Sequence, residues 1–138
     1  MNNIRKPVTL IALAMLPAAV SAATFDGGKP LLCAIQTVNE CISGHGCSAL
    51  QPAEVNLPDF LEVDAANNVI SGTAAITPVE RVEHLDGKLV LQGADDGIEE
   101  VRDGTAWTMV IAEDTGRMIL NATGDGFSIV VFGACRER

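Results

Sequence analysis

Four cysteines and one histidine are the residues whose chemistry is easiest to interpret in this sequence. Cys33, Cys41, Cys47 and Cys135 form an even set, and His45 lies between two of them. In an oxidising compartment such a set predicts two disulfides, whereas free thiolates with an imidazole would bind zinc or copper. The spacing matches no usual zinc motif, and no Cys-x-x-Cys pair is present for redox chemistry. We therefore expect two disulfides and no cofactor, with a metal site of Cys33, Cys41, His45 and Cys47 as the alternative.

The expected pairing depends on the element that carries the first two cysteines. Apolar residues in Leu31–Ile42 recur at close to helical spacing, which predicts one N-terminal helix. Cys33 and Cys41 would then lie about 12 Å apart along the helix axis, too far for a disulfide. The preferred pairing is Cys41–Cys47 with Cys33–Cys135, because a glycine-flanked turn brings the first pair together. The pairing of Cys33 with Cys47 and of Cys41 with Cys135 stays open.

The N-terminal segment has the features of a cleavable export signal. Arg5 and Lys6 precede an apolar run, Val8–Val20, and small residues follow at Val20-Ser21-Ala22. The run is too short to cross a bilayer core of roughly 30 Å as a helix. We expect a signal peptide at residues 1–22, with cleavage after Ala23 as the alternative. The mature chain of residues 23–138 is expected to form one domain, with no membrane anchor after cleavage. The expected location is the periplasm or the extracellular medium.

The mature chain would be strongly acidic. Removal of Arg5 and Lys6 leaves seven basic against eighteen acidic residues, a formal net charge of −11. Binding of nucleic acid or anionic lipid requires clustered basic residues, so this balance argues against both classes of partner. A protein partner with a basic surface or an apolar patch is compatible with it. We expect a monomer.

The rest of the mature chain has the turn signals and alternation of antiparallel strands. Asp86-Gly87 is a strong hairpin signal, and a two-residue turn there pairs His84 with Leu89 and Val82 with Leu91. The fold expected is mainly β, of the α+β class: five or six antiparallel strands in a sheet or small half-open barrel, with the N-terminal helix packed on it. The predicted strands are Val69–Ile76, Val79–Leu85, Lys88–Gln92, Thr105–Ala112, Arg117–Thr123 and Phe127–Cys135, with a short segment at Phe60–Val63.

Few other residues indicate a site. Trp107, near Met109, is the only tryptophan and would report on a pocket between sheet and helix. His84 falls on the more apolar hairpin face, and Glu80 lies on the same strand, but no common catalytic motif is present. The acidic run Gly93–Gly104 is expected to be a solvated loop.

Three functions remain open. A non-catalytic domain that binds another protein is preferred. A small-ligand carrier or sensor with a pocket near Trp107 is the alternative. An enzyme using His84 with a carboxylate is the least favoured.

Several stretches of the mature chain together resemble a set of small exported proteobacterial proteins of unknown function. This resemblance implies a bacterial, periplasmic protein and carries no activity or catalytic residues with it. The stretches are Glu40-Cys41-x-x-Gly44-x-x-Cys47, Leu57-Pro58-Asp59-Phe60-Leu61-x-Val63-Asp64, Leu91-Gln92-Gly93, Ala106-Trp107-Thr108-Met109-Val110-Ile111, Thr115-Gly116-Arg117 and Phe132-Gly133-Ala134-Cys135.

Overall fold

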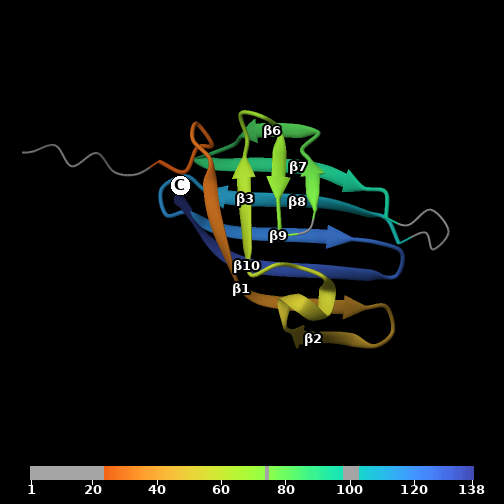
Figure 1. Cartoon of the computed structure of the whole chain (residues 1–138). Helices are drawn as coiled ribbons and strands as arrows, with labels where there is room; N and C mark the ends of the chain where they lie inside the picture. The colour runs from red at the N-terminus through yellow and green to blue at the C-terminus, as the bar shows by residue number, and fades with distance from the viewer. Residues whose placement is uncertain (1–23, 74, 98–102) are drawn as a thin grey trace, which may run out of the picture.

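The computed structural model describes residues 24–73, 75–97 and 103–138, which fold as strands and one short 3₁₀ helix, η1 (Figure 1). The expected signal peptide, residues 1–22, lies outside the described residues. The elements are β1 (Leu31–Ile42), β2 (Gly46–Leu50), η1 (Pro52–Val55), β3 (Phe60–Asp64), β4 (Val69–Ser71), β5 (Ile76–Pro78), β6 (Arg81–His84), β7 (Lys88–Asp95), β8 (Thr105–Ala112), β9 (Arg117–Thr123) and β10 (Phe127–Glu137).

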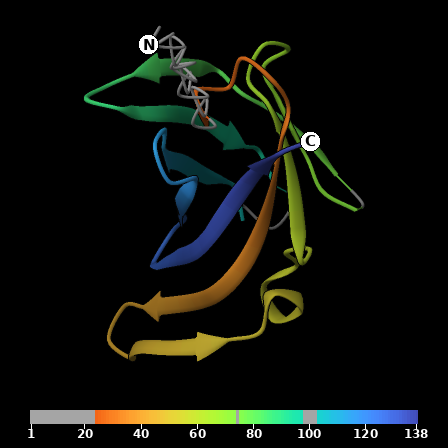
Figure 2. The same ribbon diagram turned by 90° about the vertical axis from the view of Figure 1, so that its left-hand side faces the viewer.

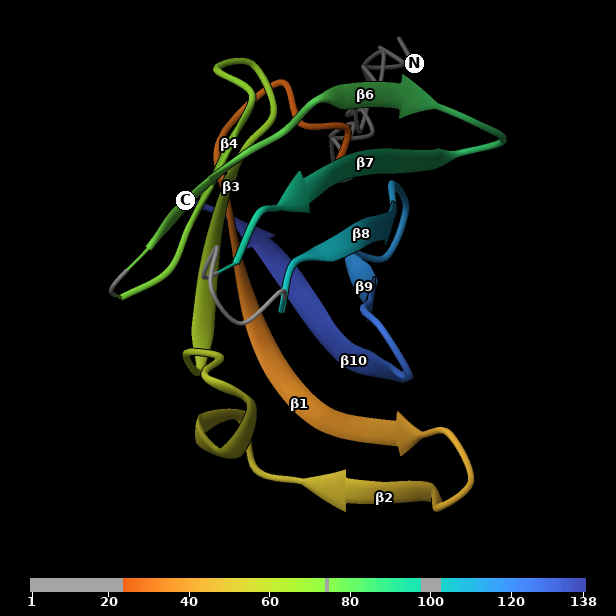
Figure 3. The ribbon, with the colours of Figure 1, turned by 90° about the vertical axis from the view of Figure 1, so that its right-hand side faces the viewer.

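All the strands belong to one antiparallel sheet that curls into a half-barrel. Their order is β5-β4-β3-β1-β10-β9-β8-β7-β6, and β2 pairs with the C-terminal half of β1. The first and last strands of this order, β5 and β6, are consecutive in the chain, so the segment between them joins the two ends of the sheet (Figure 3). There the Val79 N–H donates to the Asn68 carbonyl, and the Glu80 N–H donates to the Gln92 carbonyl.

The prediction of an N-terminal helix is wrong, because Leu31–Ile42 is the long strand β1. A register shift between Ile35 and Thr37 inserts one residue where β1 pairs with β10. Residues 31, 33 and 35 therefore face inward before the shift and residues 38, 40 and 42 after it. The shift places inward-facing Val38 three residues after Ile35, a spacing that imitates a helical repeat.

The predicted count of five to six strands is also wrong, while the class, a mainly β fold with a curled antiparallel sheet, is confirmed. Segment 69–76, expected as one strand, contains β4, a turn in which the Gly72 N–H donates to the Ala75 carbonyl, and the first residue of β5. The Asp86-Gly87 hairpin has the predicted register, and β8 and β9 have the predicted bounds.

Both disulfides connect residues that are directly opposite on neighbouring strands. Cys33 on β1 pairs with Cys135 on β10, and Cys41 on β1 pairs with Cys47 on β2. This is the pairing preferred from the sequence. Cys33 and Cys41 lie about eight strand residues, or roughly 26 Å, apart, so a bond between them is excluded by an extended chain rather than by a helix. The two disulfides indicate an oxidising environment outside the cytoplasm.

The core lies inside the curl of the sheet. Leu89 and Leu91 on β7 and Met109 and Ile111 on β8 have no measurable exposure. At one end of the half-barrel the segment before β1 packs across the sheet: the Phe25 N–H donates to the Glu113 carbonyl (Figure 2). The other end is where the candidate site lies.

Candidate functional site

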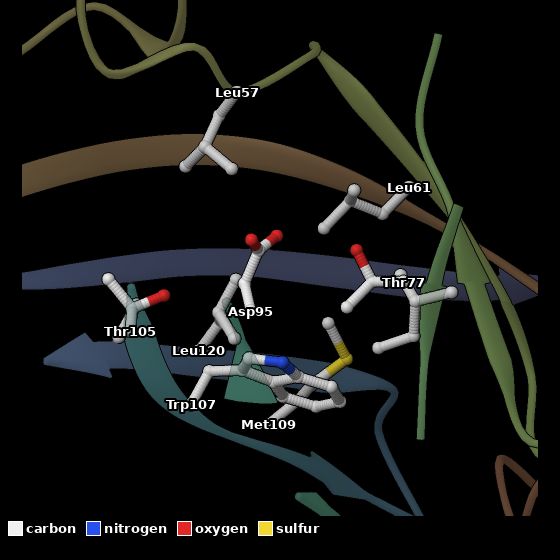
Figure 4. Close-up of a pocket in the computed structure, with 10 residues that line it drawn as sticks. Leu57, Leu61, Thr77, Asp95, Thr105, Trp107, Met109 and Leu120 are labelled. Carbon is white, nitrogen blue, oxygen red and sulfur yellow. The ribbon is translucent and has the colours of Figure 1, made fainter. Parts of the chain in front are cut away.

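A cavity of about 160 Å³ opens inside the half-barrel, next to the only tryptophan (Figure 4). Its wall is mostly apolar, and three polar side chains interrupt it. A cavity of roughly 150 Å³ is large enough for a benzene-sized molecule. The lining residues are Leu57, Leu61, Ile70, Thr77, Asp95, Thr105, Trp107, Met109, Leu120 and Ala122.

Strand alternation positions the floor of the cavity. Trp107 and Met109 occupy inward positions on β8, and Leu120 and Ala122 lie opposite them on β9. The indole ring covers Gly93 of β7, the residue opposite Trp107. A Cβ atom at Gly93 would lie 2.5 Å from Cζ2 of the indole, so only glycine leaves room for the ring in this orientation. Gly93 thereby fixes the tryptophan against the floor of the cavity.

The indole nitrogen of Trp107 is a hydrogen-bond donor without an acceptor. The side chain is only 7% exposed, and no partner for Nε1 is present among the described residues. In Figure 4 this nitrogen lies on the edge of the ring that is turned toward Asp95 and Thr77. An unpaired buried donor costs about 1–3 kcal/mol, a cost that an acceptor on a bound molecule removes.

Among the described residues that line the cavity, Asp95 is the charged one. One carboxylate oxygen, Oδ1, accepts the Gly97 N–H at 2.9 Å, and no side chain among the described residues forms an ion pair with this carboxylate. The hydroxyl-bearing side chains of Thr77 and Thr105 lie on the same lining. The cavity therefore offers an indole donor, an anionic acceptor and hydroxyls around an apolar floor.

A second cavity of about 320 Å³ continues the first one past Asp95. The two share Leu57, Leu61, Ile70, Thr77 and Asp95 in their linings. The second extends to Pro58 and Gly72, beside the β4–β5 turn. A molecule seated on Trp107 can thus extend along this groove without entering the core.

The other residues predicted from the sequence are not brought into this cavity. Glu80 lines a separate depression that also reaches Trp107 and includes Arg81 and Gln92. His84 is paired not with Glu80 but with Glu113, whose Oε1 lies 2.7 Å from His84 Nδ1.

The His84–Glu113 pair supplies the carboxylate that an enzyme using this histidine requires. The His84 side chain is 58% exposed at the rim of the sheet. Among the described residues no other side chain is hydrogen-bonded to it, so no nucleophile is held beside the imidazole. The pair joins the β6–β7 hairpin to the β8–β9 turn, and it lies outside the Trp107 cavity.

The alternative metal site is not formed. Cys33, Cys41 and Cys47 all have their sulfur atoms in disulfides, and no cysteine of the described chain is free. His45 Nδ1 lies 3.1 Å from the Ser43 carbonyl oxygen in the β1–β2 turn. In the part of the chain that the structure describes, no cluster of three or more His, Cys, Asp or Glu side chains is arranged to hold a metal ion.

Sequence reasoning anticipated Trp107 and Met109 as pocket residues but missed the opposite wall. The sequence predicts a solvated loop at Gly93–Gly104, whereas β7 continues to Asp95. Alternation from Leu89 through Leu91 and Gly93 places Asp95 on the inward side, and this signal is present in the sequence. The remaining wall residues come from the loop after η1 and from β3, β4 and β5, which only the curl of the sheet brings opposite β8.

No protein-family model matches this chain, and no curated protein or solved structure is similar to it at a significant level. Among the described helices, none has the length and hydropathy needed to span a membrane. The function is therefore inferred from the geometry of the cavity and of the sheet surface.

Proposed function

We propose that this protein binds a small, largely apolar molecule in the Trp107 cavity and acts as a carrier or sensor in the periplasm or outside the cell. The observation that carries this proposal is the unpaired Nε1 donor of Trp107, buried beside an apolar cavity of about 160 Å³. Ligand sites commonly combine an apolar wall with a few convergent polar groups, and the mouths of curled sheets are a frequent location for them. The cavity needs no catalytic group for this role.

The polar groups define the head group of the ligand. Trp107 Nε1 requires an acceptor, and the Asp95 carboxylate favours a donor and disfavours an anion. A neutral group that both accepts and donates, such as a hydroxyl or a primary amide, satisfies both residues. A carboxylate would be repelled by Asp95, and an ammonium group would leave the indole without an acceptor.

The size of the groove predicts modest affinity. A ligand that buries on the order of 200 Å² of apolar surface gains about 5 kcal/mol. This free energy corresponds to a Kd of roughly 0.2 mM before any hydrogen bond is added. A chain of about eight carbons with a polar head fits the first cavity and its continuation, and each hydrogen bond made to the head group adds about 1 kcal/mol.

The test is a titration followed by intrinsic fluorescence. The chain has one tryptophan and no tyrosine, so the emission reports on the cavity alone. The probes are 1-octanol, octanamide, octanoate and octylamine, which share their chain length. We expect saturable emission changes with the alcohol and the amide at concentrations at least about fivefold lower than with the acid or the amine.

A matched pair of variants separates cavity binding from general adsorption. Ala122→Leu places a larger side chain on the cavity wall, whereas Ala49→Leu makes the same change at an exposed position on β2. We expect the first to weaken 1-octanol binding and the second to leave it unchanged. Equal affinities in both variants, or no saturation with any of the four probes, would contradict the proposal.

A further inference from the structure

The outer face of the sheet carries an exposed apolar row on the side opposite the cavity. Val90, Val110, Ile119 and Phe132 are directly opposite one another on the four neighbouring strands β7, β8, β9 and β10. Ile119 is 46% exposed and Phe132 is 43% exposed. The side chains on the other face of the same strands form the core, so folding does not require the outer row to be apolar.

Nothing in the described part of the chain covers this row. Strands β7 to β10 contact their sheet neighbours, and neither η1 nor the β3–β4–β5 layer packs on their outer side (Figure 3). Large apolar side chains grouped on an open surface mark contact sites more often than singly exposed ones do. The cross-strand row is such a group.

The charges around the row are unlike those of the rest of the protein. By the alternation of each strand, the outward positions of β1, β7, β8, β9 and β10 include no aspartate or glutamate, although the chain has eighteen acidic residues. The same positions include three basic residues, Lys88, Arg117 and Arg136. At the β6 edge, Glu83 lies opposite Val90 at the end of the row and forms an ion pair with Arg81. The outer face is therefore apolar and basic on β9 and β10, while its acidic residue Glu83 lies at the β6 edge and is paired with Arg81.

Two of the three outward basic residues lack an ion-pair partner within the described part of the chain. Neither Arg117 nor Arg136 forms an ion pair with any described residue, whereas the other described basic residues do: Lys29, Arg81, Lys88 and Arg138. Arg117 precedes Ile119 by two residues on β9 and lies opposite Ala134, which is flanked on the outer side of β10 by Phe132 and Arg136. On this outer side Arg117 thus lies two residues from Ile119, and Arg136 lies four residues from Phe132.

We infer that the outer face of β7–β10 is a docking surface for an acidic polypeptide segment of another protein. Apolar side chains of that segment would cover Ile119 and Phe132, and its carboxylates would bind Arg117 and Arg136 in the forked geometry that arginine favours. The net charge of the mature chain is compatible with a basic partner, but the local charge of this face favours an acidic one. A second copy is disfavoured here, because a two-fold contact through this face would place guanidinium groups against each other.

The test uses two labelled synthetic peptides and fluorescence anisotropy at low salt. One is an 18-residue amphipathic peptide with leucines on one helical face and glutamates on the other, and the second has lysine in place of every glutamate. We expect the acidic peptide to bind and the basic one to bind at least about tenfold more weakly. Binding of the acidic peptide should weaken in 0.5 M salt, because exposed ion pairs are screened.

Charge reversal and truncation locate the contact. Arg117→Glu should weaken the acidic peptide at least about fivefold, whereas Lys29→Glu makes the same charge change in the segment before β1 and should leave its affinity unchanged. Ile119→Ser should weaken binding, whereas Leu85→Ser, a change at another exposed apolar residue, should not. Three results would overturn the inference. The first is tighter binding of the basic peptide, and the second is an equal effect of the two variants in either pair. The third is a wild-type dimer that Ile119→Ser dissociates, with no binding of peptide.

Discussion

Replacement of Gly93 by alanine tests whether Trp107 is held against the cavity floor by the absence of a side chain beneath it. The new Cβ atom would lie 2.5 Å from Trp107 Cζ2 and 2.9 Å from the Pro78 carbonyl oxygen. Carbon–carbon contacts are optimal at about 3.5–4.0 Å, so the approach to the indole is roughly 1 Å too short. Movement of the indole relieves the first contact but not the second, so the backbone that joins the ends of the sheet has to shift as well.

Two measurable effects follow from this displacement. Overpacking of this kind costs about 1–3 kcal/mol in the free energy of unfolding, which for a domain of this size lowers Tm by roughly 4–12 °C. The indole moves away from Gly93, so its emission spectrum changes and the affinity for 1-octanol falls. Urea denaturation and the fluorescence titration measure the two effects separately.

The matched control is Gly28→Ala. Gly28 is exposed and has an ordinary φ, and the nearest atom to a Cβ there is Asp26 Oδ1 at 3.2 Å, the end of a flexible side chain. We expect wild-type emission and affinity for this variant. Wild-type emission and 1-octanol affinity in Gly93→Ala would refute the assigned role of Gly93.

The remaining predictions concern the disulfides, the export signal and the head group of the ligand. Cys33→Ala/Cys135→Ala opens a loop of about 100 residues and should lower the free energy of unfolding by about 4.7 kcal/mol by chain entropy, roughly twice the loss expected for Cys41→Ala/Cys47→Ala. Urea denaturation measures both losses, and equal losses would contradict the entropic account. Intact mass of exported protein should show cleavage after residue 22 and four alkylations only after reduction; alkylation without reduction would exclude the two disulfides. Asp95→Asn should reduce the discrimination of 1-octanol over octanoate at least about threefold in the fluorescence titration, and unchanged discrimination would remove Asp95 from the head-group site.

Local turn chemistry made part of the fold predictable. Asp86-Gly87 requires two consecutive residues with positive φ, which the structure has at both positions. Such a turn sets the register of the β6–β7 hairpin, and every pair predicted from it is present. Strands β8 and β9 were predicted with their bounds because tight turns with glycine separate continuous apolar segments.

Features that depend on contacts between residues distant in the chain could not be predicted from local sequence patterns. The register shift between Ile35 and Thr37 gives β1 a hydrophobic spacing that belongs to a helix, and only its pairing with β10 identifies it as a strand. The two ends of the sheet are joined by two backbone hydrogen bonds, from the Val79 N–H to the Asn68 carbonyl and from the Glu80 N–H to the Gln92 carbonyl. The two acceptors belong to opposite ends of the sheet. No local pattern encodes that contact, so the wall of the cavity opposite Trp107 was missed with it.

The two proposed binding surfaces differ in charge from the chain as a whole, because the charge is unevenly distributed. The sheet directs the acidic residue Asp95 inward to the cavity, while Arg117 and Arg136 point outward on the opposite face. The inner and outer groups alternate along the same strands, so their side chains are separated by one layer of backbone. Variants of the cavity and variants of the outer face should therefore act independently. The double variant Ala122→Leu/Arg117→Glu should bind 1-octanol as Ala122→Leu does, and it should bind the acidic peptide as Arg117→Glu does. A reciprocal effect of peptide on 1-octanol affinity would instead show that the two faces of this sheet are coupled.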